Sequence, residues 1–224
     1  MHVSTLLEPR SRRYGGASAD ERREERRARI IEAAFQVFGD LGYPQVTQRL
    51  ICAQARLADR YFHEHFDSMH ACYQAVHDIA CQEAAAVVQQ AILAQPGELL
   101  VRARAGLRAF FEYIGSDPRR ATILVKGFSA AGLSAEYRVS QQYGDIVDLL
   151  RHRFRQRCGA RADEIDVDHV LTGCIGMVGH IAMLWIERGC KADVDAMVEH
   201  ALCAWRGLDL WLTELSGDSP PASV

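Results

Sequence analysis

The sequence lacks the signatures of several common protein classes. Its seven cysteines include no CxxC pair, which argues against a disulfide scaffold and favours a reducing, cytoplasmic environment. The first residues contain no apolar run of the kind that a secretory signal needs. The longest uncharged apolar run, Val170 to Ile186, is at the short limit for a membrane span and contains His180, so a buried helix is expected there.

Signatures of catalysis are also missing. The chain has no glycine-rich phosphate loop, no GxSxG elbow and no carboxylate pair with evident acid and base roles, so an enzyme is not expected. One stretch gathers residues of metal-ligand type, but it has no HExxH motif and no paired cysteines. We therefore predict surface and interface side chains, and no metal or cofactor, for His63, His65, His70, Cys72, His77 and Cys81.

Charge is distributed unevenly along the chain. The net charge is −3, which gives no global attraction to nucleic acid. Through Phe66, however, the sequence has 11 Arg against 9 acidic residues, and beyond it 15 basic against 20 acidic residues. A mildly basic amino-terminal part on an acidic remainder fits local attraction to DNA.

No strand-like alternation of useful length occurs, so the predicted fold class is all-α. We expect a flexible arm over residues 1–25, a small domain over 26–73, a larger helical domain over 74–215 and a disordered tail over 216–224. The helices beyond the small domain are predicted at Ser68 to Ala94, Glu98 to Gly115, from Asp117-Pro118 onward, Ser134 to Cys158, Asp166 to Arg188 and Asp193 to Leu215.

The most informative stretch is Thr47 to Phe66, TQRLICAQARLADRYFHEHF. Thr47 can cap a first short helix, whose apolar face is formed by small residues at positions 51, 52 and 55. A second helix is expected from about Ala58 to Glu64, with Phe62 and Phe66 packing on one side. The pattern indicates two short helices joined by a tight turn near Leu57.

The second of these helices leaves Asp59, Arg60, Tyr61 and His63 on its other faces. A short helix with Arg, Tyr and His, supported by a preceding helix, suits the major groove of DNA, where such side chains reach base edges and phosphates. An ordinary helical hairpin with a solvated polar face would show the same pattern.

Upstream, Arg29 to Tyr43 is predicted to form an amphipathic helix that ends at Gly42. Its buried stripe is expected to comprise Ile30, Ala34, Phe38 and Leu41. With the hairpin, this segment resembles the amino-terminal domain of the TetR (tetracycline repressor) family of bacterial regulators. The resemblance rests on RxxIIEAAFxVFxxxGY, on Thr47 to Ala55 and on YFHEHF before a fourth helix, and it covers about a fifth of the chain.

The resemblance implies a helix-turn-helix head on a larger helical body that dimerises and senses a small molecule. It also implies that the last two helices pair with their copies in a second subunit. Glycines at positions 173, 176 and 179 agree with a close approach between helices, either to that subunit or within one chain. Four positions depart from the family pattern. Arg56 stands where glycine is usual in the turn, and Ala58 replaces the usual serine, so Asp59 is expected to supply the cap. His63 replaces the common tyrosine, and Met69 replaces the lysine that usually follows the final phenylalanine.

The DNA contacts are predicted from the placement of side chains in and around the second helix of the hairpin. Arg60 and Tyr61 are expected at base edges, and the remaining four residues mostly on phosphates. The predicted DNA-binding residues are thus Thr47, Arg49, Arg60, Tyr61, His63 and His65.

A ligand pocket is predicted between the helices of the body, because apolar walls with one or two polar groups suit a small ligand. The candidate lining residues are Phe110, Phe111, Phe128, Tyr143, Met177 and His180. Plain core packing is the alternative for each of them.

The resulting hypothesis is a homodimeric repressor that binds double-stranded operator DNA and is released by a mostly apolar small-molecule effector. Two alternatives stay open. One is a helical enzyme or small-molecule-binding protein that has lost DNA affinity. The other is an interaction protein whose body has only a packed core.

Overall fold

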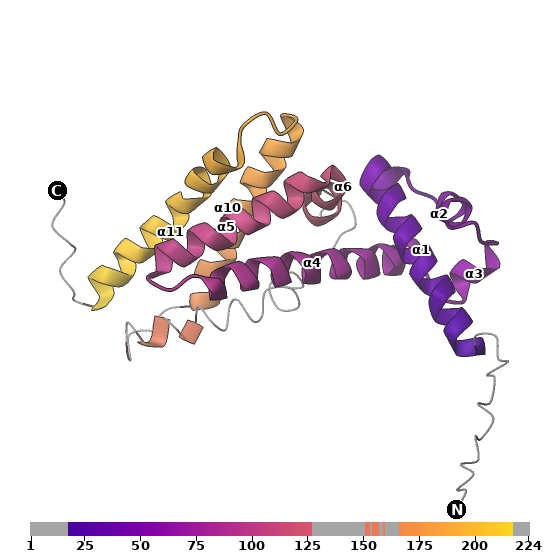
Figure 1. The fold of residues 1–224 in the computed structure, drawn as a ribbon, viewed down its shortest axis with the longest axis horizontal. Coiled ribbons are helices and arrows are strands. Elements are labelled where there is room, and N and C mark those ends of the chain that lie inside the picture. Colours follow the sequence, from indigo (N-terminus) through magenta and orange to yellow (C-terminus); the bar gives the residue numbers. More distant parts are fainter. Residues whose placement is uncertain (1–17, 127–150, 153, 157–158, 160–165, 217–224) are drawn as a thin grey trace, which may run out of the picture.

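The computed structural model describes residues 18–126, 151–152, 154–156, 159 and 166–216. Every regular element in this part of the chain is helical, which confirms the predicted all-α class. In chain order the elements are α1 (Ala19–Leu41), η1 (Tyr43–Gln45), α2 (Gln48–Ala55), α3 (Arg60–His63), α4 (Met69–Ala94), α5 (Leu99–Ser116), α6 (Pro118–Ala121), η2 (Thr122–Lys126), α10 (Val167–Glu187) and α11 (Val194–Ser216). A small head, α1 to α3, and a larger body are connected by α4 (Figure 1).

Helix α1 is longer than predicted. It begins at Ala19, so residues 19–25 are helical rather than part of a flexible arm. The reason is a capping box: Ser18 Oγ accepts a hydrogen bond from the Glu21 backbone N–H, and the Glu21 carboxylate accepts one from the Ser18 N–H. The helix ends at Gly42 as predicted, where φ is 78°.

The predicted buried stripe of α1 is correct at three of four positions. Ile30, Ala34 and Phe38 are buried, but Leu41 is 43% exposed. Leu41 lies in the last turn, where the chain leaves the helix for η1 and no longer follows the helical face toward the core.

The body confirms the predicted helices that fall within the described residues. Helix α4 is capped by Ser68, whose Oγ accepts from the Ala71 N–H at 3.0 Å, and Asp117 caps α6 through the Arg119 N–H at 3.0 Å. Helices α5 and α11 are joined at their surface by the ion pairs Arg104–Glu199 and Arg108–Asp195. Most of the predicted helix Ser134 to Cys158 lies outside the described residues.

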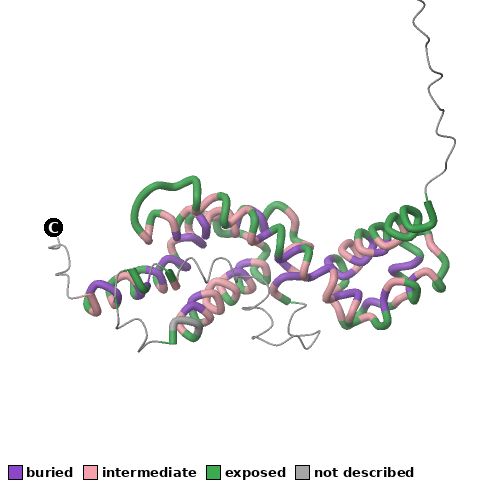
Figure 2. Tube along the Cα trace, turned by 90° about the horizontal axis from the view of Figure 1, so that it is seen from below, coloured by how far each residue is buried: buried purple, intermediate pink, exposed green. Residues whose placement is uncertain are grey.

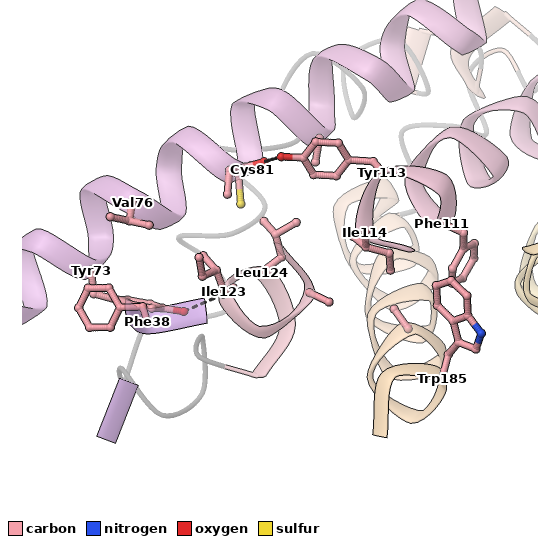
Figure 3. Close-up of a cluster of buried hydrophobic side chains, with 14 of the residues drawn as sticks. Phe38, Tyr73, Val76, Cys81, Phe111, Tyr113, Ile114, Ile123, Leu124 and Trp185 are labelled. Atoms are coloured by element: carbon pink, nitrogen blue, oxygen red, sulfur yellow. Dashed lines mark hydrogen bonds between the residues drawn. The ribbon is translucent and has the colours of Figure 1, made fainter. Parts of the chain in front are cut away.

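Buried side chains form one continuous core that extends from the head, along α4, into the body (Figure 2). In the body, the Phe111 ring packs edge-on against Trp185 with centroids 5.8 Å apart. Tyr113 points toward α4 (Figure 3). Its hydroxyl donates to the Glu83 carboxylate at 2.7 Å. The core therefore connects α5 both to α4 and to α10.

The head and the body meet at a dense junction. Tyr73 of α4 packs edge-on against Phe38 of α1, with centroids 5.0 Å apart. Its hydroxyl donates to the Ile123 carbonyl of the π-helical turn η2 at 2.7 Å (Figure 3). On the other side of α1, Gly39 lies directly on Arg119 of α6: a Cβ at this glycine would be 3.0 Å from the Arg119 Cα. A movement of α6 or η2 would therefore be transmitted directly to α1.

Only part of helix α10 is buried by the described residues. Leu171, Ala182 and Trp185 are buried, whereas only 22% of the apolar window His169–Glu187 is buried within the chain. By length and composition alone this window could also cross a membrane. No described atom lies within 4 Å of a Cβ placed at Gly173, Gly176 or Gly179, so these glycines do not serve close packing among the described residues.

Candidate nucleic-acid interface

Helix α2 and the turn after it have the predicted geometry. The Thr47 hydroxyl accepts from the Leu50 N–H at 3.4 Å, and Ile51, Cys52 and Ala55 are buried. Arg56 ends the helix in the left-handed region, with φ 53° and ψ 46°. A residue with a Cβ in this conformation costs roughly 1–2 kcal/mol. The turn is therefore strained at the position where the family usually has glycine.

Helix α3 is very short and is anchored by two aromatic side chains. Phe62 and Phe66 are buried with ring centroids 5.7 Å apart, as predicted. The expected cap by Asp59 is wrong, because the Asp59 side chain makes no capping hydrogen bond. Its carboxylate lies instead beside Cys52, where burial first and Asp59 second raise the pKa of the Cys52 thiol.

The outward face of α3 presents Arg60 and His63, which are exposed. Tyr61 is half-buried between two guanidinium groups, because Arg26 and Arg60 each lie 4.9 Å from its ring centroid. Arg60 also donates to the Tyr61 hydroxyl at 3.0 Å. Arg60 and Tyr61 thus form one polar unit at the surface. Thr47 and Arg49 are exposed at the start of α2.

His65 differs from the other five predicted DNA-binding residues. It is half-buried, and its Nε2 is enclosed without a hydrogen-bond partner. Burial and the neighbouring Arg23 lower the pKa of His65, with smaller contributions of the same sign from Arg26 and Arg27 and an opposing one from Glu64. The imidazole is therefore held neutral near pH 7, which is unfavourable for a charged phosphate contact.

The geometry of the head agrees with comparisons to known proteins. Residues 30–76 match the family model described as bacterial regulatory proteins, tetR family. Residues 30–76 are a TetR-family domain. The chain is 25% identical over 189 residues to the HTH-type transcriptional activator FasR of Mycolicibacterium smegmatis, covering 83% of this chain and 84% of that protein.

Two solved TetR-fold structures show the same architecture. FadR from Bacillus subtilis in complex with stearoyl-CoA has a TM-score of 0.63 at 16% identity, covering 86% of this chain and 99% of the other. RolR in complex with resorcinol has a TM-score of 0.57 at 18% identity, covering 90% of this chain and 98% of RolR. The TetR fold is therefore shared over the head and the body.

Four of the six predicted ligand-binding residues fall within the described part of the chain, and their surroundings differ. Phe111 is fully buried against Trp185, so it serves as core, and Phe110 and Met177 are half-buried. His180, predicted inside the pocket, is exposed on α10, and its Nδ1 donates to the Gly176 carbonyl at 2.9 Å. Phe128 and Tyr143 lie outside the described residues.

Two of the six side chains named above as metal-ligand types, His77 and Cys81, are neighbours and are buried rather than at the surface as expected. Both are buried one helical turn apart on α4, and the Cys81 sulfur lies 3.8 Å from a ring nitrogen of His77. Among the described residues no group of three His, Cys, Asp or Glu side chains could hold a metal ion.

Sequence reasoning missed the role of the arginines on α1. Arg23, Arg26 and Arg29 recur at three-residue spacing and contact the backbone or side chains of α2 and α3. The spacing itself was visible in the sequence, because residues three apart share a helix face. Which neighbouring element that face meets required the tertiary structure.

Proposed function

We propose that the protein is a cytoplasmic homodimeric regulator that reads operator DNA with α3 and loses DNA affinity when an apolar ligand binds its body. The observation that carries the DNA-binding part is the exposure of Arg60 and His63 on a helix that Phe62 and Phe66 anchor from behind. Such a helix can enter a major groove without disturbing the core of the head.

In this proposal, Arg60 and Tyr61 contact base edges, while Thr47, Arg49 and His63 contact phosphates. The Thr47 hydroxyl accepts from Leu50 within α2, which leaves its hydrogen available for a phosphate oxygen. Arg60 must leave the Tyr61 hydroxyl to reach a base. We assign His65 a supporting role behind α3, since its ring is half-buried and uncharged near pH 7.

Substitution of Arg60 tests this assignment. If Arg60 makes a bidentate contact with a guanine, Arg60→Ala should cost about 1–3 kcal/mol at the preferred operator and relax sequence preference. Arg49→Ala should weaken all sequences alike and reduce the salt slope of binding by about 1. Gln89→Ala, an exposed change on α4, is the control. Equal binding of every tested site by Arg60→Ala and the parent would overturn the assignment.

We propose that α10 and α11 form the dimer interface. The support is the exposed glycine face of α10, together with Leu184 and Leu210, which are 46% and 59% exposed in the single chain. Glycines let a second helix approach closely, and an isologous interface of this kind places two heads on two half-sites.

Sedimentation velocity tests the interface. Gly176→Leu should separate the subunits, because the new side chain would occupy the space that a partner helix needs. Ala86→Leu, at an exposed position of α4, should leave the parent's association unchanged. A parent that is monomeric at micromolar concentration would contradict the dimer.

We propose a mostly apolar effector for the body. Few charges lie among its core side chains, and a desolvated charge without a partner is costly. The stearoyl-CoA and resorcinol bound by FadR and RolR, both of which carry apolar groups, support this ligand class. The contacts of Tyr73 with Ile123 and of Gly39 with Arg119 supply a route from the body to the head.

Thermodynamic linkage tests the proposed release. An effector that lowers DNA affinity must bind the DNA-free arrangement more tightly, and operator DNA must then lower effector affinity by the same factor. Stearoyl-CoA and resorcinol are the first probes, titrated with and without operator. Equal affinity of an effector in both states would show that the body is not a sensor, and transcription in vitro would distinguish repression from activation.

A further inference from the structure

Three arginines on one face of α1 lie against the two carboxyl-terminal ends of the helix-turn-helix. Arg29 donates from the same Nη2 to the carbonyls of Ala55, at 2.6 Å, and Arg56, at 3.2 Å. One helical turn and a half earlier, Arg23 donates to the Glu64 carbonyl at 3.3 Å. The last carbonyls of a helix have no partner within it, and cationic donors nearby satisfy them and interact favourably with the helix dipole.

The contact of Arg29 falls on the strained turn. Arg56 is a non-glycine residue in the left-handed region, and its own N–H already bonds back into α2, to the carbonyls of Cys52 and Ala53. The carbonyls of Ala55 and Arg56 point the other way and receive the guanidinium of Arg29. That side chain therefore binds the two peptide groups that fix the direction in which the chain leaves α2 for α3.

Helix α3 has little stability of its own to supply this direction. It comprises four residues and has no side-chain cap, and isolated helices shorter than about 12 residues are marginal in water. Its orientation depends on the two phenylalanine anchors and on α1. Arg26 contributes by lying over the Tyr61 ring and by pairing with Glu64 at 3.6 Å.

We infer that Arg29 is a positioning residue for DNA recognition: by binding the Ala55 and Arg56 carbonyls it holds the left-handed turn and thereby the angle of α3. This inference rests on the proposed DNA-binding function. It separates Arg29 from a phosphate ligand, which would act by releasing counterions.

The test is a double-mutant cycle of Arg29→Ala with Arg56→Gly. Arg29→Ala alone should weaken operator binding about tenfold, because two carbonyls lose a charged donor. Arg56→Gly removes the Cβ strain, so in its background the loss should shrink to about twofold. The slope of log affinity against log salt should match the parent's, whereas removal of a phosphate ligand lowers it by about 1. Additive effects, or a lowered slope, would overturn the inference.

Two further variants complete the experiment. Arg22→Ala on the same helix is the matched control, since the Arg22 side chain is exposed and has no hydrogen bond or ion pair with the described residues. Arg29→Lys should recover part of the affinity, because an ammonium can reach one carbonyl as a point charge. The same cycle measured by unfolding without DNA reports the Arg29–Arg56 coupling directly. Absence of DNA binding by the parent would contradict the proposed function, and absence of coupling in unfolding would contradict this inference.

Discussion

The head and the α10–α11 end of the body differ in how far other described residues support and cover their helices. In the head, several helix ends are supported from within the chain: Ser18 caps α1, and Arg29 and Arg23 bind carbonyls at the ends of α2 and α3. At the other end, α10 carries three glycines at which an added Cβ would meet no described atom of a packed neighbour within 4 Å. The difference indicates that one copy of the chain suffices to shape the head, whereas the face of α10 is built for something outside the described chain.

The consequences for mutation differ accordingly. A change in the head should act on the stability of one subunit and should not depend on protein concentration. A change on the glycine face of α10 should act on subunit association, and its effect should depend on protein concentration. The following predictions test this contrast.

The largest effect is expected at Phe38, which is 1% exposed and contacts the rings of Tyr43 and Tyr73. Phe38→Ala should lower the free energy of unfolding by about 3–5 kcal/mol, the usual cost of a phenylalanine-sized cavity. Leu41→Ala on the same helix, 43% exposed, should stay within about 0.5 kcal/mol. Urea unfolding at two protein concentrations measures both. A Phe38 effect that grows with dilution would break the contrast, since the head would then depend on a second copy.

Replacing glycine by alanine should change the free energy of unfolding by an intermediate amount, with opposite signs at the head–body junction and on α10. Gly39→Ala places a Cβ against Arg119 and should destabilise by about 1–3 kcal/mol through overpacking at the junction. Gly173→Ala meets no described atom. At concentrations low enough to separate subunits, it should stabilise by up to about 1 kcal/mol, because alanine favours the helix. Thermal unfolding compares them, and destabilisation by Gly173→Ala in the separated subunit would show that α10 is covered within its own chain.

The smallest expected effect is a pH dependence of the free energy of unfolding, caused by His65 behind α3. The pKa of His65 is lowered from its ordinary 6.5. The unfolded chain therefore binds more protons than the folded one below about pH 6.5, and the free energy of unfolding should fall as the pH drops from 6.5 toward the folded pKa. His65→Gln should flatten this decline. His70→Gln, at an exposed position of α4, should leave it in place. An identical decline in parent and His65→Gln would show that His65 is not the responsible group.

Periodicity identified the helices of the described chain because each buries a continuous stripe. Ile30, Ala34 and Phe38 are an example. Thr47 and Ser68 mark helix starts in another way, because their hydroxyls accept hydrogen bonds from the Leu50 and Ala71 N–H groups. The start of α1 was placed too late, because the run of Arg and Glu after Ser18 has no apolar stripe. Its helix depends on the capping box and on contacts with α3.

The exposure of a site residue was predictable where residues close in sequence determine it. It was not predictable where a distant helix covers the side chain. Exposure of Arg60 and His63 follows from the placement of Phe62 and Phe66 on the opposite side of α3. The sequence does not indicate that His65 is half-buried or that His180 is exposed. A sequence does not show that three arginines of a distant helix cover His65, nor that α10 turns His180 outward.

By itself, the sequence determined the all-α class, the caps and breaks of most helices, and the turn at Arg56, because each depends on residues within one or two helical turns of one another. Only the tertiary structure decided which helices meet. It placed Arg29 on the α2 carbonyls, Gly39 on Arg119 and Tyr73 on the Ile123 carbonyl. Among the described residues, none covers the glycine face of α10. The contacts of Arg29, Gly39 and Tyr73 join residues from 26 to 80 positions apart, and the stripe of a single helix specifies that it is buried without specifying against what.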